Sequence, residues 1–252
     1  MKKSDLLQSG RDFYNGLYEQ DVIEEARWLE FGAPDKTDSI EQLLARKGIK
    51  PLSILEIGCG SGSILRELER RHIGSELFGV DFSESAISYA RSASPRIKYF
   101  TGDVTSPDLA LPREHFDLVV VSHVLEHLEN PAEFLRKIQR VSFGAMIAEV
   151  PLEDLPVSRL KALLRDRRKN FAGHVQFFTA GSFRALLRSA GYSITSFRRY
   201  SPVSSLESIR FAARRNGLSR LRSQLTEQAR TTSPSTSLSG ASSTTPTSPP
   251  SA

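Results

Sequence analysis

The stretch "ILEIGCGSGS", residues 54–63, places an apolar segment directly before three glycines, Gly58, Gly60 and Gly62. Glycine lets a backbone turn sharply and approach a ligand without a Cβ in the way, so a strand, a glycine turn and a helix are expected here. The dinucleotide-binding pattern G-x-G-x-x-G requires a third glycine three residues after the second. That position is Ser63, so the spacing is G-x-G-x-G and excludes the dinucleotide pattern.

The chain around this turn alternates between strand-like and helix-like patterns. Asn130 is the expected N-cap of one helix with Pro131 at its first position, and Thr179 is the expected N-cap of a later one. Alternation of this kind predicts an α/β fold with a doubly wound, mostly parallel sheet that helices cover on both faces. The expected strands are 52–57, 76–80, 97–100, 116–121 and 144–150, and the expected helices between them are 62–71, 84–92 and 131–141.

Residues 1–50 are expected to form an N-terminal helical cap. One helical pattern ends at Gly32, and a second begins at Asp38, which is spaced from Glu41 as in a capping box, and stops at Gly48. The first residues contain lysines with no apolar segment behind them, so a signal peptide is not expected. No apolar run reaches the roughly 18 residues of a membrane span, and a cytoplasmic protein is expected.

The remaining chain is expected to form one main domain and two extensions. The domain spans 51–200, with a basic insertion at 152–173, and basic helices follow at 201–230. In the last segment, 231–252, only Leu238 is not Ser, Thr, Pro, Gly or Ala. Such a composition cannot bury a core, so a disordered tail is expected there.

The composition limits the classes of function. A hydrophobic content of 39% and a charged content of 25% are ordinary for a soluble globular protein. Cys59 is the only cysteine, so no intrachain disulfide or cysteine-based metal cluster can form, and no metal site is expected. Residues 1–150 carry 18 Lys+Arg against 24 Asp+Glu, whereas residues 151–252 carry 16 against 5. A basic half is typical of contact with nucleic acid, an anionic membrane surface or an acidic substrate, or forms solvated helix faces.

Acidic residues follow the expected strands at their carboxyl ends, the edge at which open α/β sheets bind ligands. Asp81 ends the second strand in "GVDFSESAI", Asp103 follows the third in "FTGDV", and Glu126–His127 follow the fourth in "FDLVVVSHVLEHLENP". With Glu56 before the glycine turn, these four motifs resemble the class I S-adenosylmethionine-dependent methyltransferases over residues 50–150. They are most similar to the methyltransferase type 11 group, which includes quinone-pathway and saccharide-tailoring enzymes.

The resemblance implies an S-adenosylmethionine cofactor and a role for each motif. The Asp81 carboxylate would accept hydrogen bonds from both ribose hydroxyls, and Asp103 resembles the acidic residue that takes the adenine amino group. Cys59 is expected to be a small packing residue and not a nucleophile. The expected cofactor-binding residues are Glu56, Gly58, Cys59, Gly60, Gly62, Asp81, Phe82, Asp103, Val104 and Ser122.

The methyl acceptor is expected to be a small molecule, a saccharide or a lipid-linked group, methylated at oxygen. Histidine suits proton removal near neutral pH, so His123 and His174 are the candidate catalytic residues, whereas His127 is expected to be structural. Lys36 is expected on a solvated helix face. The candidate acceptor-binding residues are Tyr14, Tyr18, Phe178 and Arg165, the last on a basic lid for an anionic part of the acceptor or an anionic membrane surface.

Two other classes of function stay open. An RNA methyltransferase would use "RLKALLRDRRKNF" (159–171) as a phosphate-binding stripe. No RNA-binding module is recognisable beside it and aromatic residues do not interleave with the arginines, so no specific nucleic acid is expected. The other class is a non-catalytic protein that only binds the cofactor, against which the intact glycine turn and both aspartates argue.

Overall fold

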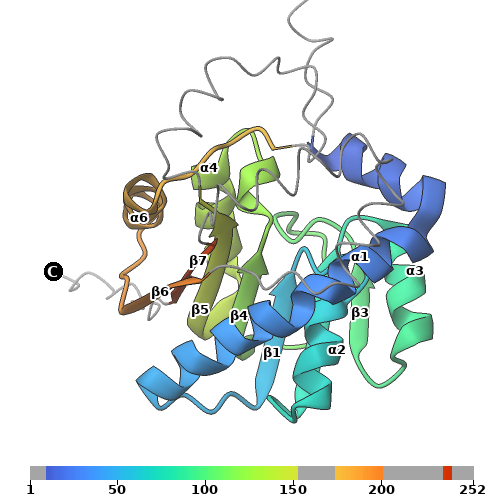
Figure 1. The fold of residues 1–252 in the computed structure, drawn as a ribbon, viewed down its shortest axis with the longest axis horizontal. Helices are drawn as coiled ribbons and strands as arrows, with labels where there is room; N and C mark the ends of the chain where they lie inside the picture. The colour runs from blue at the N-terminus through green and yellow to red at the C-terminus, as the bar shows by residue number, and fades with distance from the viewer. Residues whose placement is uncertain (1–9, 153–173, 201–234, 240–252) are drawn as a thin grey trace, which may run out of the picture.

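A seven-stranded sheet forms the centre of the computed structural model, which describes residues 10–152, 174–200 and 235–239 (Figure 1). The strands are β1 Ser53–Ile57, β2 Glu76–Asp81, β3 Lys98–Thr101, β4 His115–Ser122, β5 Ser142–Pro151, β6 Ser196–Tyr200 and β7 Ser235–Ser239. Their order in the sheet is β3-β2-β1-β4-β5-β7-β6. Strands β1 to β5 pair in parallel, whereas β7 is antiparallel to both β5 and β6.

Helices cover both faces of this sheet (Figure 1). One face carries α1 Gly10–Lys47, α2 Ser63–Arg70 and α3 Glu84–Ala93, and the other carries α4 Pro131–Lys137, the 3-10 helix η3 Ile138–Arg140 and α6 Ala180–Ser189. Successive strand residues point to opposite faces, so Ile54 of β1 packs under α1–α3 and Leu55 under α4 and α6. Leu118 and Val119 of β4 divide in the same way. The predicted doubly wound sheet is therefore confirmed.

Parallel pairing brings the carboxyl ends of β1, β2 and β4 to one edge of the sheet. Ile57, the last residue of β1, pairs with Val80 of β2 and with Val121 of β4. Asp81 and Ser122 come next on those two strands. Polar groups from separate strands therefore meet where the glycine turn begins, as the sequence predicted.

The local signals for helix ends in the central domain are also confirmed. Asn130 Oδ1 accepts a hydrogen bond from the Glu133 amide at 3.1 Å, and Pro131 is the first residue of α4. At α6, Thr179 Oγ1 accepts a hydrogen bond from the Ser182 amide at 3.1 Å. Each bond satisfies a backbone donor that the first turn of a helix leaves without a partner.

The N-terminal part differs from the prediction, because the break between its two helical stretches falls at Asp21 and not after Gly32. Gly32 and Pro34 lie inside α1, and the chain departs from helical geometry at Asp21, with φ −157° and ψ 83°. Asp21 Oδ1 accepts a hydrogen bond from the Glu24 amide at 2.9 Å, which restarts the helix. Packing of α1 on α2 and α3, with Arg71 donating to the Pro34 carbonyl oxygen at 3.2 Å, overrides the local stop signals. The predicted boundary at Gly32 is therefore wrong.

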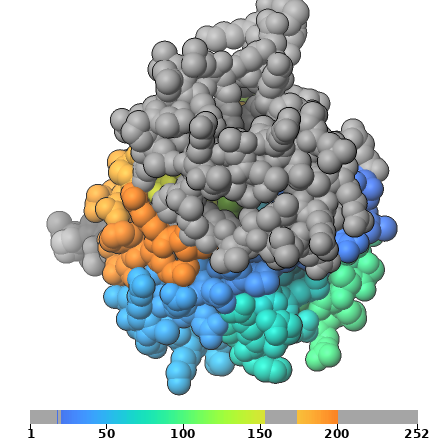
Figure 2. All heavy atoms as spheres, viewed as in Figure 1, coloured from blue at the N-terminus to red at the C-terminus, as the bar shows by residue number. Residues whose placement is uncertain are grey.

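Helix α1 also reaches the far edge of the sheet. Arg46 Nη1 donates to the Phe197 carbonyl oxygen of β6 at 3.2 Å. The Arg184 guanidinium of α6 lies 3.8 Å from the centroid of the Phe197 ring. Segment 174–200 and α1 consequently adjoin on the molecular surface (Figure 2). None of the helices in the described segments is long and apolar enough to cross a membrane.

The C-terminal residues include a strand that the sequence did not predict. Residues 235–239 form β7, which pairs with 147–151 of β5 and 196–200 of β6. Strand pairing uses backbone groups, so a Ser/Thr-rich segment can enter a sheet without the apolar alternation that marks other strands. The basic insertion from residue 153, the basic helices at 201–230 and the rest of the expected tail lie outside the described residues.

Deleting residues 231–252 should lower the melting temperature, because the deletion removes β7 from between β5 and β6. The sequence alone predicts no effect, since the segment has almost no apolar surface to lose. In a chain of this size each kcal/mol of lost stability corresponds to roughly 2–4 °C. Thermal unfolding followed by circular dichroism measures the change, and deletion of residues 241–252, which keeps β7, is the matched control. Equal melting temperatures for all three proteins would show that β7 adds nothing to the sheet.

Candidate functional site

The glycine turn after β1 adopts backbone conformations that favour glycine. The φ angles of Gly58 and Gly62 are 74° and 76°, in the left-handed region. A Cβ on Gly60 would lie 2.3 Å from Tyr18 Oη, so α1 leaves no room for a side chain there. The Gly58 amide donates to the Val80 carbonyl oxygen at 2.8 Å and anchors the turn to β2. The predicted reason for these glycines, a sharp turn without a Cβ, agrees with this geometry.

Asp81 at the end of β2 fixes the position of the turn. Its Oδ2 accepts a hydrogen bond from the Gly60 amide at 2.8 Å, and its Oδ1 accepts one from the Ser83 amide at 2.9 Å. The side chain is buried. The carboxylate therefore joins the glycine turn to the residues that follow β2.

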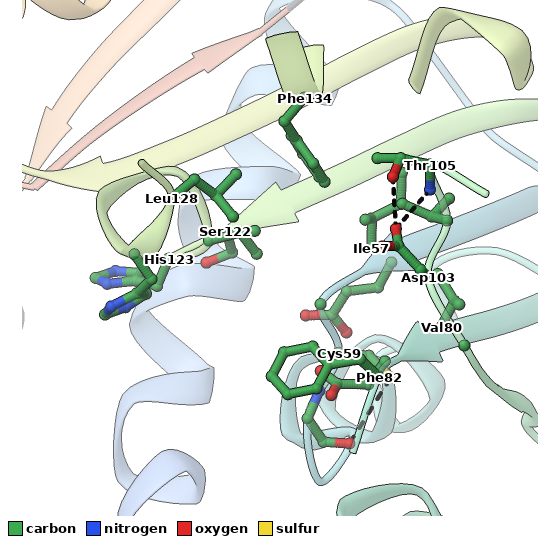
Figure 3. Close-up of a pocket in the computed structure, with 18 of the residues that line it drawn as sticks. Ile57, Cys59, Val80, Phe82, Asp103, Thr105, Ser122, His123, Leu128 and Phe134 are labelled. Atoms are coloured by element: carbon green, nitrogen blue, oxygen red, sulfur yellow. Dashed lines mark hydrogen bonds between the residues drawn. The ribbon is translucent and has the colours of Figure 1, made fainter. Parts of the chain in front are cut away.

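Asp103 after β3 is held by its own turn. Its Oδ1 accepts hydrogen bonds from the amide and the hydroxyl of Thr105, at 2.8 and 2.7 Å (Figure 3). The Gly102 amide donates to the Asp81 carbonyl oxygen at 2.8 Å and joins the ends of β2 and β3. The two aspartates that the sequence placed at successive strand ends are therefore neighbours on one rigid edge.

A cavity of about 410 Å³ opens at this edge (Figure 3). Cavities of roughly 300–1,000 Å³ are typical of sites for small molecules and cofactors. Nine of the ten predicted cofactor-binding residues line it, namely Glu56, Gly58, Cys59, Gly60, Asp81, Phe82, Asp103, Val104 and Ser122. Gly62 instead forms the N-cap of α2, where a Cβ would lie 2.3 Å from Tyr99 Oη.

The candidate acceptor-binding and catalytic residues are divided between the cavity wall and its surroundings. Tyr18 and His123 line the cavity. The His174 ring packs edge-on against the ring of His127, with centroids 5.0 Å apart, and His127 lines the cavity. His174 is thus joined to the wall through His127.

Phe178 lies elsewhere, in the apolar core under α6. It is buried, and its ring centroid is 5.6 Å from that of Phe183. The side chain of Tyr14 and the whole of Arg165 lie outside the described part of the chain, so their roles stay predictions.

The cavity wall also contains residues that the sequence analysis missed. Thr105, Phe134 and Lys137 line it, and Figure 3 shows Phe134 pointing into the cavity from α4. Phe134 and Lys137 are three residues apart and so share one face of a helix, a spacing that could have indicated them. Lys36, expected on a solvated face, also lines the cavity because α1 passes over this edge.

Glu56 is a buried acid at the centre of the cavity wall. Its Oε2 has no hydrogen-bond partner among the described residues. Burial raises the pKa of Glu56 to about 8, with Lys36 opposing the shift and Asp81 adding to it. Glu56 therefore carries a proton near neutral pH unless a cation or an N–H donor enters the cavity beside it.

A charged cluster lies beyond the ends of β4 and β5. The His123 ring stands between Glu149 of β5 and Glu126 of the 3-10 helix η2 (Leu125–His127). Tyr200 of β6 donates its hydroxyl hydrogen to Glu149 Oε1. Sequence reasoning did not find Glu149 and Tyr200 as parts of a site, because they come from strands distant along the chain.

Part of this cluster has a composition that metal ions favour. Glu126, His127 and His174 offer ligand atoms that all lie within 4.8 Å of one another. The Glu126 carboxylate, however, already lies 3.1 Å from His123 Nδ1. We therefore assign this group to charge pairing and not to a metal.

Replacing Glu56 by Gln should remove a pH-dependent loss of stability in the protein without ligand. The folded pKa of about 8 lies above the ordinary value of 4.5, so the contribution of Glu56 is full below the unfolded pKa and is lost as the pH rises through the folded one. The melting temperature of the wild type should therefore fall more steeply between about pH 5 and pH 8 than that of Glu56→Gln. Glu84→Gln, at an exposed position, is the control. Parallel curves for wild type and Glu56→Gln would contradict the assigned pKa.

The known sequences that this chain resembles are those of methyltransferases. The family model described as a methyltransferase domain matches residues 28–196. The chain is 38% identical over 93 residues to the ubiquinone biosynthesis O-methyltransferase of Azorhizobium caulinodans, and the matched segment covers 35% of each protein. It is 31% identical over 135 residues to the enzyme of that name from Alkalilimnicola ehrlichii, covering 52% of this chain and 53% of the relative. The chain thus spans about a third to a half of the length of these curated relatives.

Solved structures share the fold at low sequence identity. Magnesium protoporphyrin IX methyltransferase from Synechocystis, with S-adenosylhomocysteine bound, matches with a TM-score of 0.56, 20% identity and 84% coverage of both chains. An S-adenosylmethionine-dependent methyltransferase from Thermotoga maritima matches with a TM-score of 0.60 and 17% identity, covering 90% of this chain and 99% of its own. Because the family model spans more than half of the 252 residues, the protein belongs to the methyltransferase domain family of the class I S-adenosylmethionine-dependent methyltransferases.

Proposed function

We propose that this protein transfers the methyl group of S-adenosylmethionine to an oxygen atom of a small-molecule acceptor. The observation that carries the proposal is the 410 Å³ cavity, whose wall holds the family's cofactor motifs at one end and an aromatic and histidine-containing surface at the other. The named relatives that are O-methyltransferases of ubiquinone biosynthesis support an oxygen acceptor. A trans-aconitate 2-methyltransferase, 29% identical over 129 residues, supports a small acceptor.

The cavity wall fits S-adenosylmethionine as its occupant. Glu56 Oε2 and Ser122 Oγ are buried and have no hydrogen-bond partner in the described residues, and the cofactor carries an ammonium group, ribose hydroxyls and an adenine amino group that can donate to such atoms. Gly58 and Gly60 present backbone without side chains to the same space. Buried acceptors and an open backbone are what a hydrogen-bond-rich cofactor requires.

Each acidic residue would then hold one part of the cofactor. Asp81, which the Gly60 and Ser83 amides hold at the cavity wall, would accept hydrogen bonds from the ribose hydroxyls. Asp103, held by Thr105, would accept the adenine amino group. Glu56 would ionise beside the ammonium group, since a neighbouring positive charge lowers a carboxyl pKa.

The protein's own contribution to the reaction is alignment and exclusion of water. When bound, the cofactor would supply an electrophilic methyl group on a sulfonium, and its transfer to a hydroxyl oxygen would leave S-adenosylhomocysteine and release one proton. Phe134 and Val124 would exclude water from this space. Holding the acceptor oxygen in line with the methyl group makes the transfer effectively unimolecular.

The chemical class of the acceptor, including its charge, is also part of this proposal. Lys36 places positive charge on the cavity wall and would suit an anionic saccharide or lipid-linked acceptor, whereas the charge of Lys137 is paired with that of Glu133, which also lines the cavity. The expected lid around Arg165, with its contact to an anionic membrane surface, lies outside the described residues, as does the stripe on which the RNA alternative rests. Both therefore stay predictions.

Asp81→Ala should weaken binding of S-adenosylmethionine and of S-adenosylhomocysteine. The ribose hydroxyls would lose a charged acceptor, whose loss costs roughly 1.5–3 kcal/mol, or about a ten- to hundredfold higher Kd. Isothermal titration calorimetry measures the change, with Asp108→Ala, at an exposed position, as the control. Unchanged affinity in Asp81→Ala would argue decisively against the cofactor pose.

Methyl transfer itself can be tested before the acceptor is known. Purified protein is incubated with isotopically methyl-labelled S-adenosylmethionine and fractionated cell extract, with Asp81→Ala as the inactive control. Mass spectrometry should find labelled methyl ether or ester groups in the small-molecule fraction with wild type only. Label in the RNA fraction would support the RNA alternative, and no label in any fraction would count against catalysis.

A further inference from the structure

His123 has both ring nitrogens directed at buried carboxylates. Its Nδ1 lies 3.1 Å from Glu126 Oε1, and its Nε2 lies 3.2 Å from Glu149 Oε1. The carboxylate side chains are 0% and 1% exposed, whereas the imidazole is 29% exposed and lines the cavity. The ring is therefore the boundary between the cavity and a buried pair of acids.

A neutral imidazole does not suit this arrangement. It has one N–H donor and one nitrogen lone pair, so one of the two carboxylates would face a lone pair. Two buried carboxylates with no cation between them would also repel each other. An imidazolium donates from Nε2 to Glu149 Oε1 and places its positive charge beside Glu126, whose carboxylate oxygens make no hydrogen bond in the described residues.

The other charged and titratable groups around the His123 ring do not cancel the effect of the two carboxylates, which favour the cationic form. Burial and Lys36 of α1 lower the pKa of His123, but Glu126 and Glu149 outweigh them and raise it above the ordinary value of 6.5. Tyr200 adds a hydroxyl donor to Glu149 from β6. The pKa of each of these carboxyls is lowered although burial opposes it.

Two further histidines stand on the far side of Glu126. His127 Nε2 lies 3.7 Å from Glu126 Oε1, and the charges of His127 and His174 contribute to the lowered pKa of Glu126. They therefore favour ionisation of this carboxylate.

The backbone holds the ring in place as well. His123 has a φ angle of 56°, which is uncommon for a residue other than glycine, and its amide donates to the Glu149 carbonyl oxygen at 3.0 Å. The Glu126 carbonyl oxygen accepts hydrogen bonds from the amides of Val175 and Gln176 at 2.8 and 2.9 Å. The end of β4, the end of β5 and the segment after residue 174 thus converge on one side chain.

We propose that His123 is a positioning residue, held as an imidazolium between Glu126 and Glu149, and that it does not take the proton of the methyl acceptor. This inference rests on the proposed function, because it assigns a role within that site. An imidazolium carries a hydrogen on both ring nitrogens, so no lone pair is left to accept a proton. The cation instead fixes the wall against which the acceptor lies, next to Ser122 at the end of β4.

Nitrogen-15 NMR of the imidazole rings tests the charge state without any acceptor. The chain has five histidines, and the signals that disappear in His123→Asn identify the ring, since Asn tolerates positive φ. Near pH 7, above the ordinary pKa, the His123 ring should still show two protonated nitrogens, with and without S-adenosylhomocysteine. A ring with a single protonated nitrogen at that pH would overturn the proposal.

The variant Glu149→Gln tests whether the charge of Glu149 holds His123 in its cationic form. Gln keeps the shape and one oxygen acceptor but removes the charge, so the titration midpoint of His123 should fall by about one pH unit or more. Glu84→Gln, whose carboxylate is 70% exposed, is the matched control and should leave the midpoint in place. An unchanged midpoint in Glu149→Gln would overturn the proposal. The titration of His123 does not depend on methyl transfer. If the protein methylates nothing, the proposed function is refuted, but the titration still tests the charge of His123.

Thermal unfolding provides a second measurement should Glu149→Gln fail to fold. A histidine whose folded pKa is raised adds stability that is full below its unfolded pKa and is lost as the pH rises through the folded one. The melting-temperature difference between wild type and His123→Asn should therefore be larger near pH 6 than near pH 9. A difference independent of pH would contradict the imidazolium.

Discussion

The Asp81 carboxylate connects the two turns on which the cavity is built. One of its oxygens holds the Gly60 amide of the turn after β1, and the other holds the Ser83 amide at the start of α3. Because β1 and β2 pair in parallel, these turns lie side by side, and a buried carboxylate can satisfy a donor from each. The position of the glycine turn, and so the shape of the cofactor end of the cavity, depends on this one side chain.

The central sheet was predictable because its residues carry the signal locally. Each expected strand is a short apolar run, and both faces of such a strand are buried, as Ile54 and Leu55 show. Helix N-caps at Asn130 and Thr179 could be predicted for the same reason, since a cap is made within one turn. These features depend on residues that are neighbours in sequence.

The elements that were not predicted depend on contacts between distant segments. Helix α1 continues through Gly32 and Pro34 because α2 and α3 support it, and no local pattern records that support. Strand β7 has no apolar alternation, because its place between β5 and β6 rests on backbone pairing. Predictions from propensity are weakest where tertiary contacts override it.

The residues of the candidate site also fall into those that local sequence predicts and those that depend on contacts between distant segments. Residues at strand ends, such as Asp81 and Asp103, could be predicted because a parallel sheet brings its carboxyl ends to one edge. Lys36 reaches the cavity only because of the path of α1, and Glu149 became relevant only once β5 was placed beside β4. His123 was expected as a base from its position alone. Glu126 is only three residues away in the sequence, whereas Glu149 becomes a neighbour through the pairing of β4 with β5.

Three buried carboxyl groups show how the fold assigns different charge states to the same chemical group. Glu56 has an oxygen without a hydrogen-bond partner, and its raised pKa keeps it protonated until a positively charged or N–H-bearing ligand arrives. Glu126 and Glu149 share a histidine cation that belongs to the protein, and their pKa values are lowered. The Glu56 oxygen is thus left without a partner until a ligand binds, whereas Glu126 and Glu149 have His123 beside them in the protein itself. A site built this way places the unsatisfied carboxyl where the cofactor's positive charge is needed and provides the acceptor with a rigid wall.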